Sequence, residues 1–498
     1  MRNRSSGVLL HISSLMGPYG IGVFGGDALR FIDFLQKGGF SAWQVLPFSI
    51  PDACNSPYKS ISAFAGNPLF IDPARLLEQG LITAEELESC KAESPYAVDF
   101  DHLKEQRAKL FDSAFSRCPA ALWEKVEAWR KEQPWLEDFA LYSALKAETG
   151  KDWIDWPQAL RAREPQAMQE AKVRLHRTME REIFLQYLFF TQWQNIRAYA
   201  KERGIAMIGD MPIYVSYESA DVWSNQHLFA LSEKGRMLEE AGVPPDYFSE
   251  DGQRWGNPLY NWAAMKAEGY SWWVARLRHA STLFDQIRID HFRAFSAYWA
   301  VPIEAETAKE GRWKSGPGMD LFDTLFANID KDLLIAEDLG VQDEALTALL
   351  KETDLPGMRV LQFAFPGGDN NMHLPHNYSE NTVAYTGTHD NNTLLGYLWE
   401  QTPEDRRYAL DYCGFRGDNW KDGGVQNPAI RALIRAVFAS PAYLAVVPIQ
   451  DLLGYGGDTK MNRPGVAGGN WSYRLTEEAF AQLAPEEYRK LSALYNRI

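Results

Sequence analysis

Short apolar runs recur along the chain, and helical periodicity fills most of the segments between them. Residues 7–11 and 42–47 are two such runs, and the segment that separates them places apolar side chains on one side of a helix. A strand, a helix and a second strand at this spacing indicate a parallel βαβ unit. Six further strands are predicted at residues 205–210, 287–293, 333–337, 358–365, 382–390 and 443–451.

Eight strands that alternate with helices match the count of a (β/α)8 TIM barrel. The alternation is interrupted after the second strand, because residues 73–190 carry only helical signals, among them a capping box at Thr83-Ala84-Glu85-Glu86. We therefore expect a barrel built from residues 1–72 and 191–498, with a helical insertion subdomain at 73–190 between strands two and three. Long loops over the barrel mouth are expected, chiefly 214–262, and residues 476–498 are predicted as helix, with no C-terminal β-sandwich domain.

Four of the predicted strands end in a carboxylate: Asp210, Asp290, Glu337 and Asp390. The active sites of (β/α)8 barrels lie at the carboxyl ends of the strands. Any one of these acids could instead cap a helix. Four carboxylates at one face repel each other and require compensation, so the barrel mouth is the predicted site.

Two of these acids have surroundings that predict different protonation states. Arg288 and Asp290 lie two residues apart on a predicted strand and would point to the same side, where a guanidinium favours the ionised carboxylate. From these residues alone, a structural ion pair and a nucleophile are both open. Four apolar residues precede Glu337, and an apolar environment would raise its pKa as an acid/base requires. Two such carboxylates suit glycoside chemistry.

Composition narrows the classes of partner. A formal net charge of −15 and a pI of about 5.2 disfavour nucleic acid. Four scattered cysteines lack metal-ligand spacing, so we expect reduced thiols, no metal site and a cytoplasmic protein. No apolar run reaches the length of a signal peptide or a membrane span. The letters of a dinucleotide fingerprint at residues 20–25 do not follow directly from a strand, and phosphate-loop and nucleophile-elbow motifs are absent from the sequence.

Several motifs resemble those of a known family. Residues 208–214 (IGDMPIY), 288–293 (RIDHFR), 337–340 (EDLG) and 387–391 (GTHDN) resemble, in order, the four regions shared by the α-amylase clan of glycosidases. Residues 242–258, 56–58, 375–378, 461–465 and 469–471 are similar to one branch, the amylomaltases or 4-α-glucanotransferases of glycoside hydrolase family 77. The likeness runs from Val8 to about Leu475; Met16, where the family commonly has Pro, and residues 52–55 depart from it.

The resemblance implies a role for each acid. Asp290 would be the nucleophile that forms a glycosyl-enzyme, Glu337 the acid/base, and Asp390 the acid that grips the sugar and stabilises the oxocarbenium-like state. Arg288, His389 and Asp210 would hold the donor sugar. The implied lining of the glucan channel is Tyr58, Gln253, Trp255 and Asn462. The family is not known to need a cofactor.

The expected activity is the transfer of α-1,4-glucan segments, with maltooligosaccharides as donors and acceptors. Hydrolysis of the α-amylase type is an alternative, because both reactions share one covalent intermediate. A glucan-binding protein without catalysis is a third reading. Aromatic residues in the mouth loops would stack an acceptor sugar and exclude water, which favours transfer: Tyr247, Phe248, Trp255, Tyr260 and Trp262. The sequence leaves the oligomeric state open.

Overall fold

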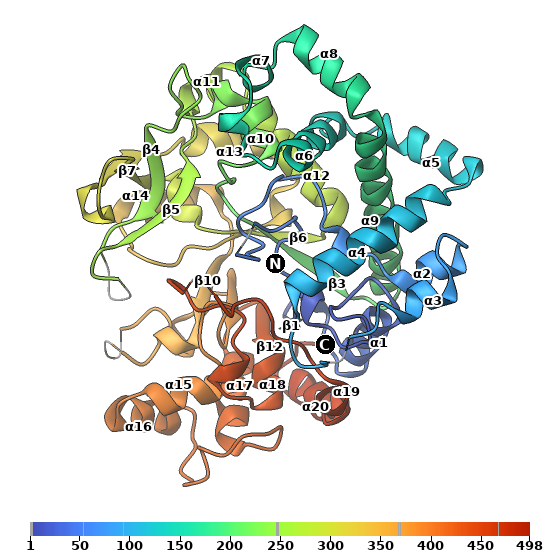
Figure 1. The fold of residues 1–498 in the computed structure, drawn as a ribbon. Helices are drawn as coiled ribbons and strands as arrows, with labels where there is room; N and C mark the ends of the chain where they lie inside the picture. Colours follow the sequence, from blue (N-terminus) through green and yellow to red (C-terminus); the bar gives the residue numbers. More distant parts are fainter. Residues whose placement is uncertain are drawn as a thin grey trace.

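The computed structural model describes residues 3–498 except 53, 93, 246–248, 367, 369 and 467. Within these residues, eight parallel strands form one sheet in the order β10-β11-β12-β1-β2-β3-β6-β9 (Figure 1). Their bounds are β1 Ser5–Leu9, β2 Ala42–Gln44, β3 Ala206–Met211, β6 Gln286–Ile289, β9 Leu334–Ala336, β10 Gly357–Val360, β11 Thr382–Tyr385 and β12 Leu444–Pro448. The Ala336 amide donates to the Pro356 carbonyl at 2.9 Å and so joins the two edge strands. The predicted (β/α)8 barrel is confirmed.

Helices surround this barrel because its strands are apolar on both faces, as in other parallel sheets. Helix α1 (Gly26–Lys37) joins β1 to β2, buries Phe31 and Ile32, and ends before Gly39, whose φ of +70° suits glycine. The other outer helices are α9 His176–Glu202, α12 Ser271–Leu283, α13 Met319–Phe326, α14 Glu344–Thr353, α15 Leu394–Glu400, α16 Pro403–Tyr412 and α17 Pro428–Ala439. In the described part of the connection from β10 to β11, only short 3-10 turns replace an α-helix.

The segment between β2 and β3 is helical, as the sequence indicates. It contains α2 Pro73–Glu78, α3 Ala84–Glu88, α4 Phe100–Ser116, α5 Ala120–Arg130, α6 Leu136–Thr149, α7 Gln158–Arg161 and α8 Pro165–Arg174 before α9. The capping box at the start of α3 is present, with Thr83 and Glu86 bonded to each other's backbone amides. Residue 190, the expected end of the insertion, falls inside α9, which packs on α4, α5 and α6 and also on β3. One helix therefore belongs to both parts.

A second, antiparallel sheet stands beside the barrel and was not predicted. Its order is β5-β4-β7-β8, from β4 Glu239–Val243, β5 Gln253–Pro258, β7 Ala297–Pro302 and β8 Arg312–Ser315. The chain segments after β3 and after β6 contribute two strands each, and Gly242 pairs with Trp299 between them. Residues 214–262 were expected to be a loop. They contain β4 and β5 instead, and β4 is held by pairing with β7, which is distant in the sequence. Figure 1 shows β4, β5 and β7 to one side of the barrel strands.

Six of the eight predicted strands are shorter than expected, and two of these differences concern Asp290 and Asp390. The strand predicted at 287–293 ends at Ile289, because His291 adopts φ +52° and a 3-10 turn follows at Phe292–Phe295. The strand predicted at 382–390 ends at Tyr385, so Asp390 lies in the following loop. Asp290 and Asp390 nevertheless lie beyond the carboxyl ends of β6 and β11, on the side of the barrel where the site was predicted.

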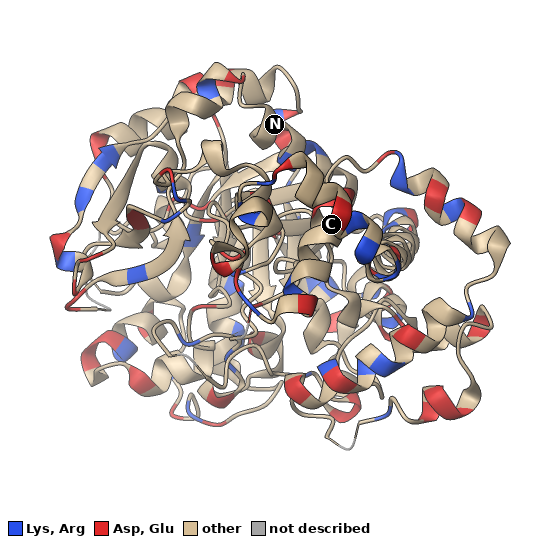
Figure 2. Ribbon diagram, turned by 45° about the horizontal axis from the view of Figure 1, so that its top comes forward, with Lys and Arg blue, Asp and Glu red and all other residues tan. Residues whose placement is uncertain are grey.

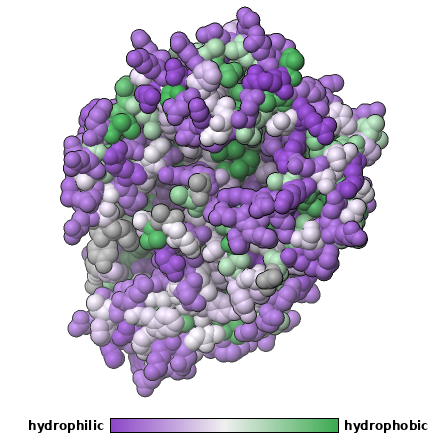
Figure 3. Space-filling model, in the orientation of Figure 1, coloured by the Kyte–Doolittle hydropathy of each residue, from purple (hydrophilic) through white to green (hydrophobic). Residues whose placement is uncertain are grey.

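The surface carries both signs of charge. Figure 2 shows acidic and basic residues interspersed along the outer helices, while the central strands are mostly uncharged. Figure 3 shows a hollow near the middle of one face, with apolar residues inside it. No helix in the described part of the chain is long and apolar enough to cross a membrane.

The C-terminal segment is helical, with α19 at Glu477–Ala481 and α20 at Pro485–Leu494. Arg497 follows α20 and is fully buried. Its guanidinium donates to the carbonyls of Phe438 at 2.7 Å, Ser5 at 2.8 Å and Ser440 at 3.0 Å. This side chain therefore connects the end of α20 to the start of β1 and to the C-terminal end of α17.

We expect Arg497→Ala to lower the free energy of unfolding by about 3 kcal/mol, because it removes a fully buried side chain together with its hydrogen bonds to three backbone carbonyls. Urea unfolding followed by circular dichroism measures this loss. Arg435→Ala, which removes an exposed contact with the Tyr495 hydroxyl, is the matched control and should change stability by less than about 0.5 kcal/mol. Equal effects of the two substitutions would contradict this account.

Candidate active site

Arg288 joins two carboxylates at the barrel mouth. Its guanidinium donates to both oxygens of Asp210, at 2.7 and 2.8 Å, and to Oδ1 of Asp290 at 3.0 Å. Strand pairing explains the first contact, because Asp210 of β3 lies opposite Arg288 of β6. The side chain of Asp210 is fully buried and that of Arg288 is 4% exposed, whereas that of Asp290 is 28% exposed. Asp290 is therefore the member of the cluster that faces the open mouth.

Glu337 follows β9 directly and is held by backbone amides. The His291 amide donates to its Oε2 at 2.6 Å, and the Leu339 amide donates to its Oε1 at 3.1 Å. The next residue, Asp338, points elsewhere and accepts from the Met358 amide and from Arg359. The turn after β6 and the end of β9 thus bring Glu337 close to Asp290.

The pKa values of these two acids are separated. Burial raises the pKa of Glu337 to about 8, helped by the charge of Asp290 and opposed by Arg288. Burial also raises the pKa of Asp290 to about 6, although Arg288 opposes the rise. The sequence analysis considered only the ion pair and missed this burial. At neutral pH Asp290 is still mostly ionised and Glu337 is mostly protonated, so the expected protonation states stand.

Asp390 has a third environment. Burial alone would raise its pKa, but His389 and Asn462 outweigh that effect and hold the pKa of Asp390 below its usual range. His389 Nε2 lies 3.3 Å from Asp390 Oδ2, and Asn462 donates to Oδ1 at 2.6 Å. Asp390 is therefore ionised at any working pH.

Tyr58 connects the pair formed by Arg288 and Asp210 to the pair formed by His389 and Asp390. Its hydroxyl donates to Asp210 at 2.6 Å, and its ring stacks on His389 with centroids 5.0 Å apart. Trp471 contacts both rings, at 5.8 and 5.9 Å. Seven of the predicted site residues thus form one connected group: Tyr58, Asp210, Arg288, Asp290, His389, Asp390 and Asn462, and Glu337 adjoins it through His291.

Gln253 and Trp255 come from β5 of the second sheet. The Trp255 indole donates to the Gln253 side chain at 3.2 Å, and its ring meets His291 edge to face at 4.9 Å. The contact with His291 places both residues beside the carboxylates. The sequence analysis expected this loop but not the strands that carry it.

The aromatic residues expected to stack an acceptor have different outcomes. Tyr247 and Phe248 lie outside the described residues. Tyr260 is 3% exposed and its hydroxyl donates to the Ile213 carbonyl at 2.6 Å, so its expected role in stacking an acceptor is wrong. Trp262 packs against Tyr260 at 4.9 Å. Among the described members of this set, Trp255 alone has a ring contact with His291, in the turn after β6 that carries Asp290.

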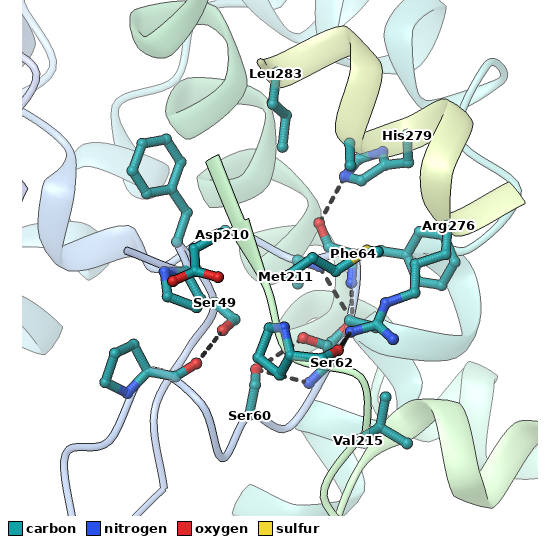
Figure 4. A pocket seen from close by; sticks show the side chains of 18 of the residues that line it. Ser49, Ser60, Ser62, Phe64, Asp210, Met211, Val215, Arg276, His279 and Leu283 are labelled. Atoms are coloured by element: carbon teal, nitrogen blue, oxygen red, sulfur yellow. Dashed lines mark hydrogen bonds between the residues drawn. The ribbon is translucent and has the colours of Figure 1, made fainter. Parts of the chain in front are cut away.

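A small cavity lies behind Asp210, and Figure 4 shows its lining. Its volume is about 70 Å³, far below the roughly 300–1,000 Å³ of most ligand pockets. The polar side chains that line it bind backbone carbonyls of the surrounding loops. His279 contacts the Phe64 carbonyl at 2.9 Å, and Arg276 donates to the Pro212 carbonyl at 2.6 Å. These contacts hold the loops that contain Phe64 and Pro212. The cavity itself is too small for a glucan chain.

Three residues of the site were missed or given no role by sequence reasoning. His291 donates its amide to Glu337, Trp471 packs on Tyr58 and His389, and Met358 accepts from Arg288 Nε through its sulfur at 3.3 Å. His291 and Trp471 lie in motifs that the sequence analysis named, and both have positive φ. No sequence signal pointed to Met358, because its contact crosses the barrel.

A pair of carboxyl groups with separated pKa values at the mouth of a (β/α)8 barrel fits the class of enzymes that cleave glycosidic bonds. A model of the family described as 4-alpha-glucanotransferase matches residues 10–479, and the chain belongs to this family. It is 43% identical to a 4-alpha-glucanotransferase of Aquifex aeolicus, covering 99% of both chains. It is 42% identical to a chloroplastic/amyloplastic one of Arabidopsis thaliana, over 99% of this chain and 86% of that one.

A solved structure is similar throughout. The amylomaltase from Streptococcus agalactiae, solved in complex with acarbose, has a TM-score of 0.95 and 36% identity, and the match covers 99% of each chain. The amylomaltase from Corynebacterium glutamicum, at 19% identity and a TM-score of 0.79, shares the fold. The match covers 99% of this chain and 74% of that one.

The raised pKa of Glu337 makes a prediction about stability. The folded protein holds this proton up to about pH 8, whereas the ordinary value is 4.5, so the stabilisation is complete below pH 4.5 and is lost as pH rises through 8. Glu337→Gln keeps a neutral side chain at every pH. We expect it to come within about 1 kcal/mol of the wild type at pH 5 and to exceed its unfolding free energy by as much as about 5 kcal/mol at pH 9, because each pH unit between 4.5 and 8 costs the wild type about 1.4 kcal/mol.

Urea unfolding of both proteins at pH 5, 7 and 9 measures the difference. Glu344→Gln, an exposed substitution on α14, controls for the change of side chain. A difference between Glu337→Gln and wild type that is constant with pH would show that Glu337 does not hold its proton in the folded state.

Proposed function

We propose that this protein transfers α-1,4-glucan segments by a retaining double displacement, with Asp290 as nucleophile and Glu337 as acid/base. The observation that carries the proposal is the contrast between these acids. Both are connected through the turn after β6, yet one is ionised and the other protonated at neutral pH. Acid and nucleophile of a retaining mechanism need this pair of states.

In the first step Glu337 gives its proton to the glycosidic oxygen while Asp290 attacks the anomeric carbon. The bond to the leaving glucan breaks, and a covalent glycosyl ester forms on Asp290. In the second step the Glu337 carboxylate takes the proton of an acceptor 4-hydroxyl, which attacks the same carbon and releases Asp290. Two inversions retain the α configuration.

The neighbouring groups serve these steps. Arg288 fixes the carboxylate of Asp290 and is itself fixed by Asp210. Asp390 stays ionised, so its negative charge would stabilise the positive charge that develops on the donor sugar. Tyr58, His389 and Asn462 are polar groups on the same side, and we assign them to the sugar hydroxyls. Gln253 and Trp255 would line the path of the glucan chain.

Transfer is favoured over hydrolysis because an acceptor sugar bound against Trp255 displaces water from the ester. The relatives named above are transferases, and the Streptococcus agalactiae protein was solved with acarbose, which supports maltooligosaccharides and α-1,4-glucans as the ligands of this chain. A hydrolase of the α-amylase type is the second candidate, since it would use the same intermediate.

A product ladder from maltotriose tests the function. We expect glucose together with maltotetraose, maltopentaose and longer chains, resolved by anion-exchange chromatography. Glucose and maltose without longer chains would identify a hydrolase. An unchanged substrate would leave only a binding protein.

The same assay tests the nucleophile. Asp290→Ala should reduce turnover by about 10⁴-fold or more while glucan binding, measured by calorimetry, persists. Asp411→Ala, an exposed substitution on the outer helix α16, is the control and should keep full turnover. Turnover that survives the loss of Asp290 would remove this residue from the mechanism.

A further inference from the structure

His291 is the residue between the proposed nucleophile and the 3-10 turn, and its backbone conformation is unusual. With φ +52° and ψ +47° it lies in the left-handed region. This conformation disfavours most residues that carry a Cβ atom, although Asn, Asp and His tolerate it better than others. Such strain tends to occur at functional sites, where the surrounding structure enforces it.

The left-handed turn directs three successive amides to different acceptors. The Asp290 amide donates to the Met211 carbonyl at 3.0 Å, the His291 amide to the Glu337 carboxylate at 2.6 Å, and the Phe292 amide to the Glu337 carbonyl at 3.0 Å. Glu337 is thus held by its side chain and by its backbone from one turn. An amide that donates to a carboxylate stabilises the ionised form and lowers its pKa, and the His291 amide acts on Glu337 in this direction.

The imidazole of His291 makes a separate contact. It meets the Trp255 indole at 4.9 Å with an angle of 83° between the rings. Trp255 belongs to β5, which is part of the second sheet and not of the barrel. This ring pair is therefore a direct link between the turn that carries the nucleophile and the strand that carries a channel residue. Edge-to-face pairs of this kind have a defined geometry, so they orient both partners.

We propose that His291 is a positioning residue: its amide sets the orientation and acidity of Glu337, and its ring holds Trp255 against the bound glucan. The inference rests on the proposed function, since it assigns the supporting contacts of that site. Burial, with the charge of Arg293, lowers the pKa of His291 to about 4, so the ring is neutral at working pH and is not a second acid.

Substitutions of His291 can separate the role of its backbone amide from the role of its ring. Gly and Asn adopt the left-handed conformation readily, so His291→Gly and His291→Asn keep the amide in place and remove the ring. We expect both to raise the KM for maltotriose about three- to tenfold, the effect of one lost aromatic contact, with kcat nearly unchanged. The alkaline limb of kcat/KM, which reports Glu337, should stay at the wild-type pH.

His291→Val removes the ring and also disfavours the left-handed turn, because Val is β-branched. The amide then turns away from Glu337, whose carboxylate loses a donor. The pKa of Glu337 should rise, which moves the alkaline limb to higher pH by about one unit, the effect of one hydrogen bond to a charged group. His291→Ala is a milder second backbone variant, with a smaller shift in the same direction. Thermal unfolding of each variant identifies any that fail to fold.

Two results would overturn the proposal. If Gly and Asn leave the KM at the wild-type value, the ring does not hold Trp255. If Val and Ala leave the alkaline limb in place, or if Gly and Asn move it equally, the amide does not set the acidity of Glu337. Glu337→Gln is measured alongside: an alkaline limb that persists in this variant means that the proposed acid is wrong, which is a different failure from that of His291.

Discussion

The buried guanidinium of Arg288 is the constraint on which the rest of the site depends. It is almost without solvent and is neutralised by Asp210 from the neighbouring strand and by Asp290 from its own turn. Removing one partner of such a buried cluster leaves an uncompensated charge and typically costs about 3–5 kcal/mol. The three residues are therefore fixed together, and because β3 and β6 pair at Asp210 and Arg288, the barrel's register places the carboxylate of Asp290.

The three acids of the site have different pKa values because each has different neighbouring groups. Burial favours a raised pKa for Asp290, Glu337 and Asp390 alike. Arg288 opposes that rise for Asp290 and, together with the His291 amide, for Glu337, whereas His389 and Asn462 outweigh it for Asp390. The result is one acid protonated at neutral pH and two ionised ones. This distribution provides the proton donor, the nucleophile and the stabilising charge that the proposed mechanism requires.

Much of this was accessible from the sequence, because it depends on local pattern. Apolar runs located all eight barrel strands, and acids at strand ends located the mouth. The second sheet was missed because β4 pairs with β7 over a long sequence separation, although Ala297–Pro302 has the composition of a strand. The raised pKa of Asp290 was also missed, since burial depends on residues from the whole barrel. The left-handed turn at His291 also depends on tertiary contacts. For this reason β6 ends earlier than the strand predicted at 287–293.

The covalent intermediate on Asp290 is the central claim, and mass spectrometry tests it most directly. Glu337→Gln lacks the acid/base, so an activated donor such as a 5-fluoroglucosyl fluoride should glycosylate the protein and remain attached. The anomeric fluoride leaves, and peptide mapping should then place one added 5-fluoroglucosyl group on the peptide that contains Asp290. An adduct on Asp210, Asp390 or any other residue, or full product formation with no adduct at all, would contradict the mechanism.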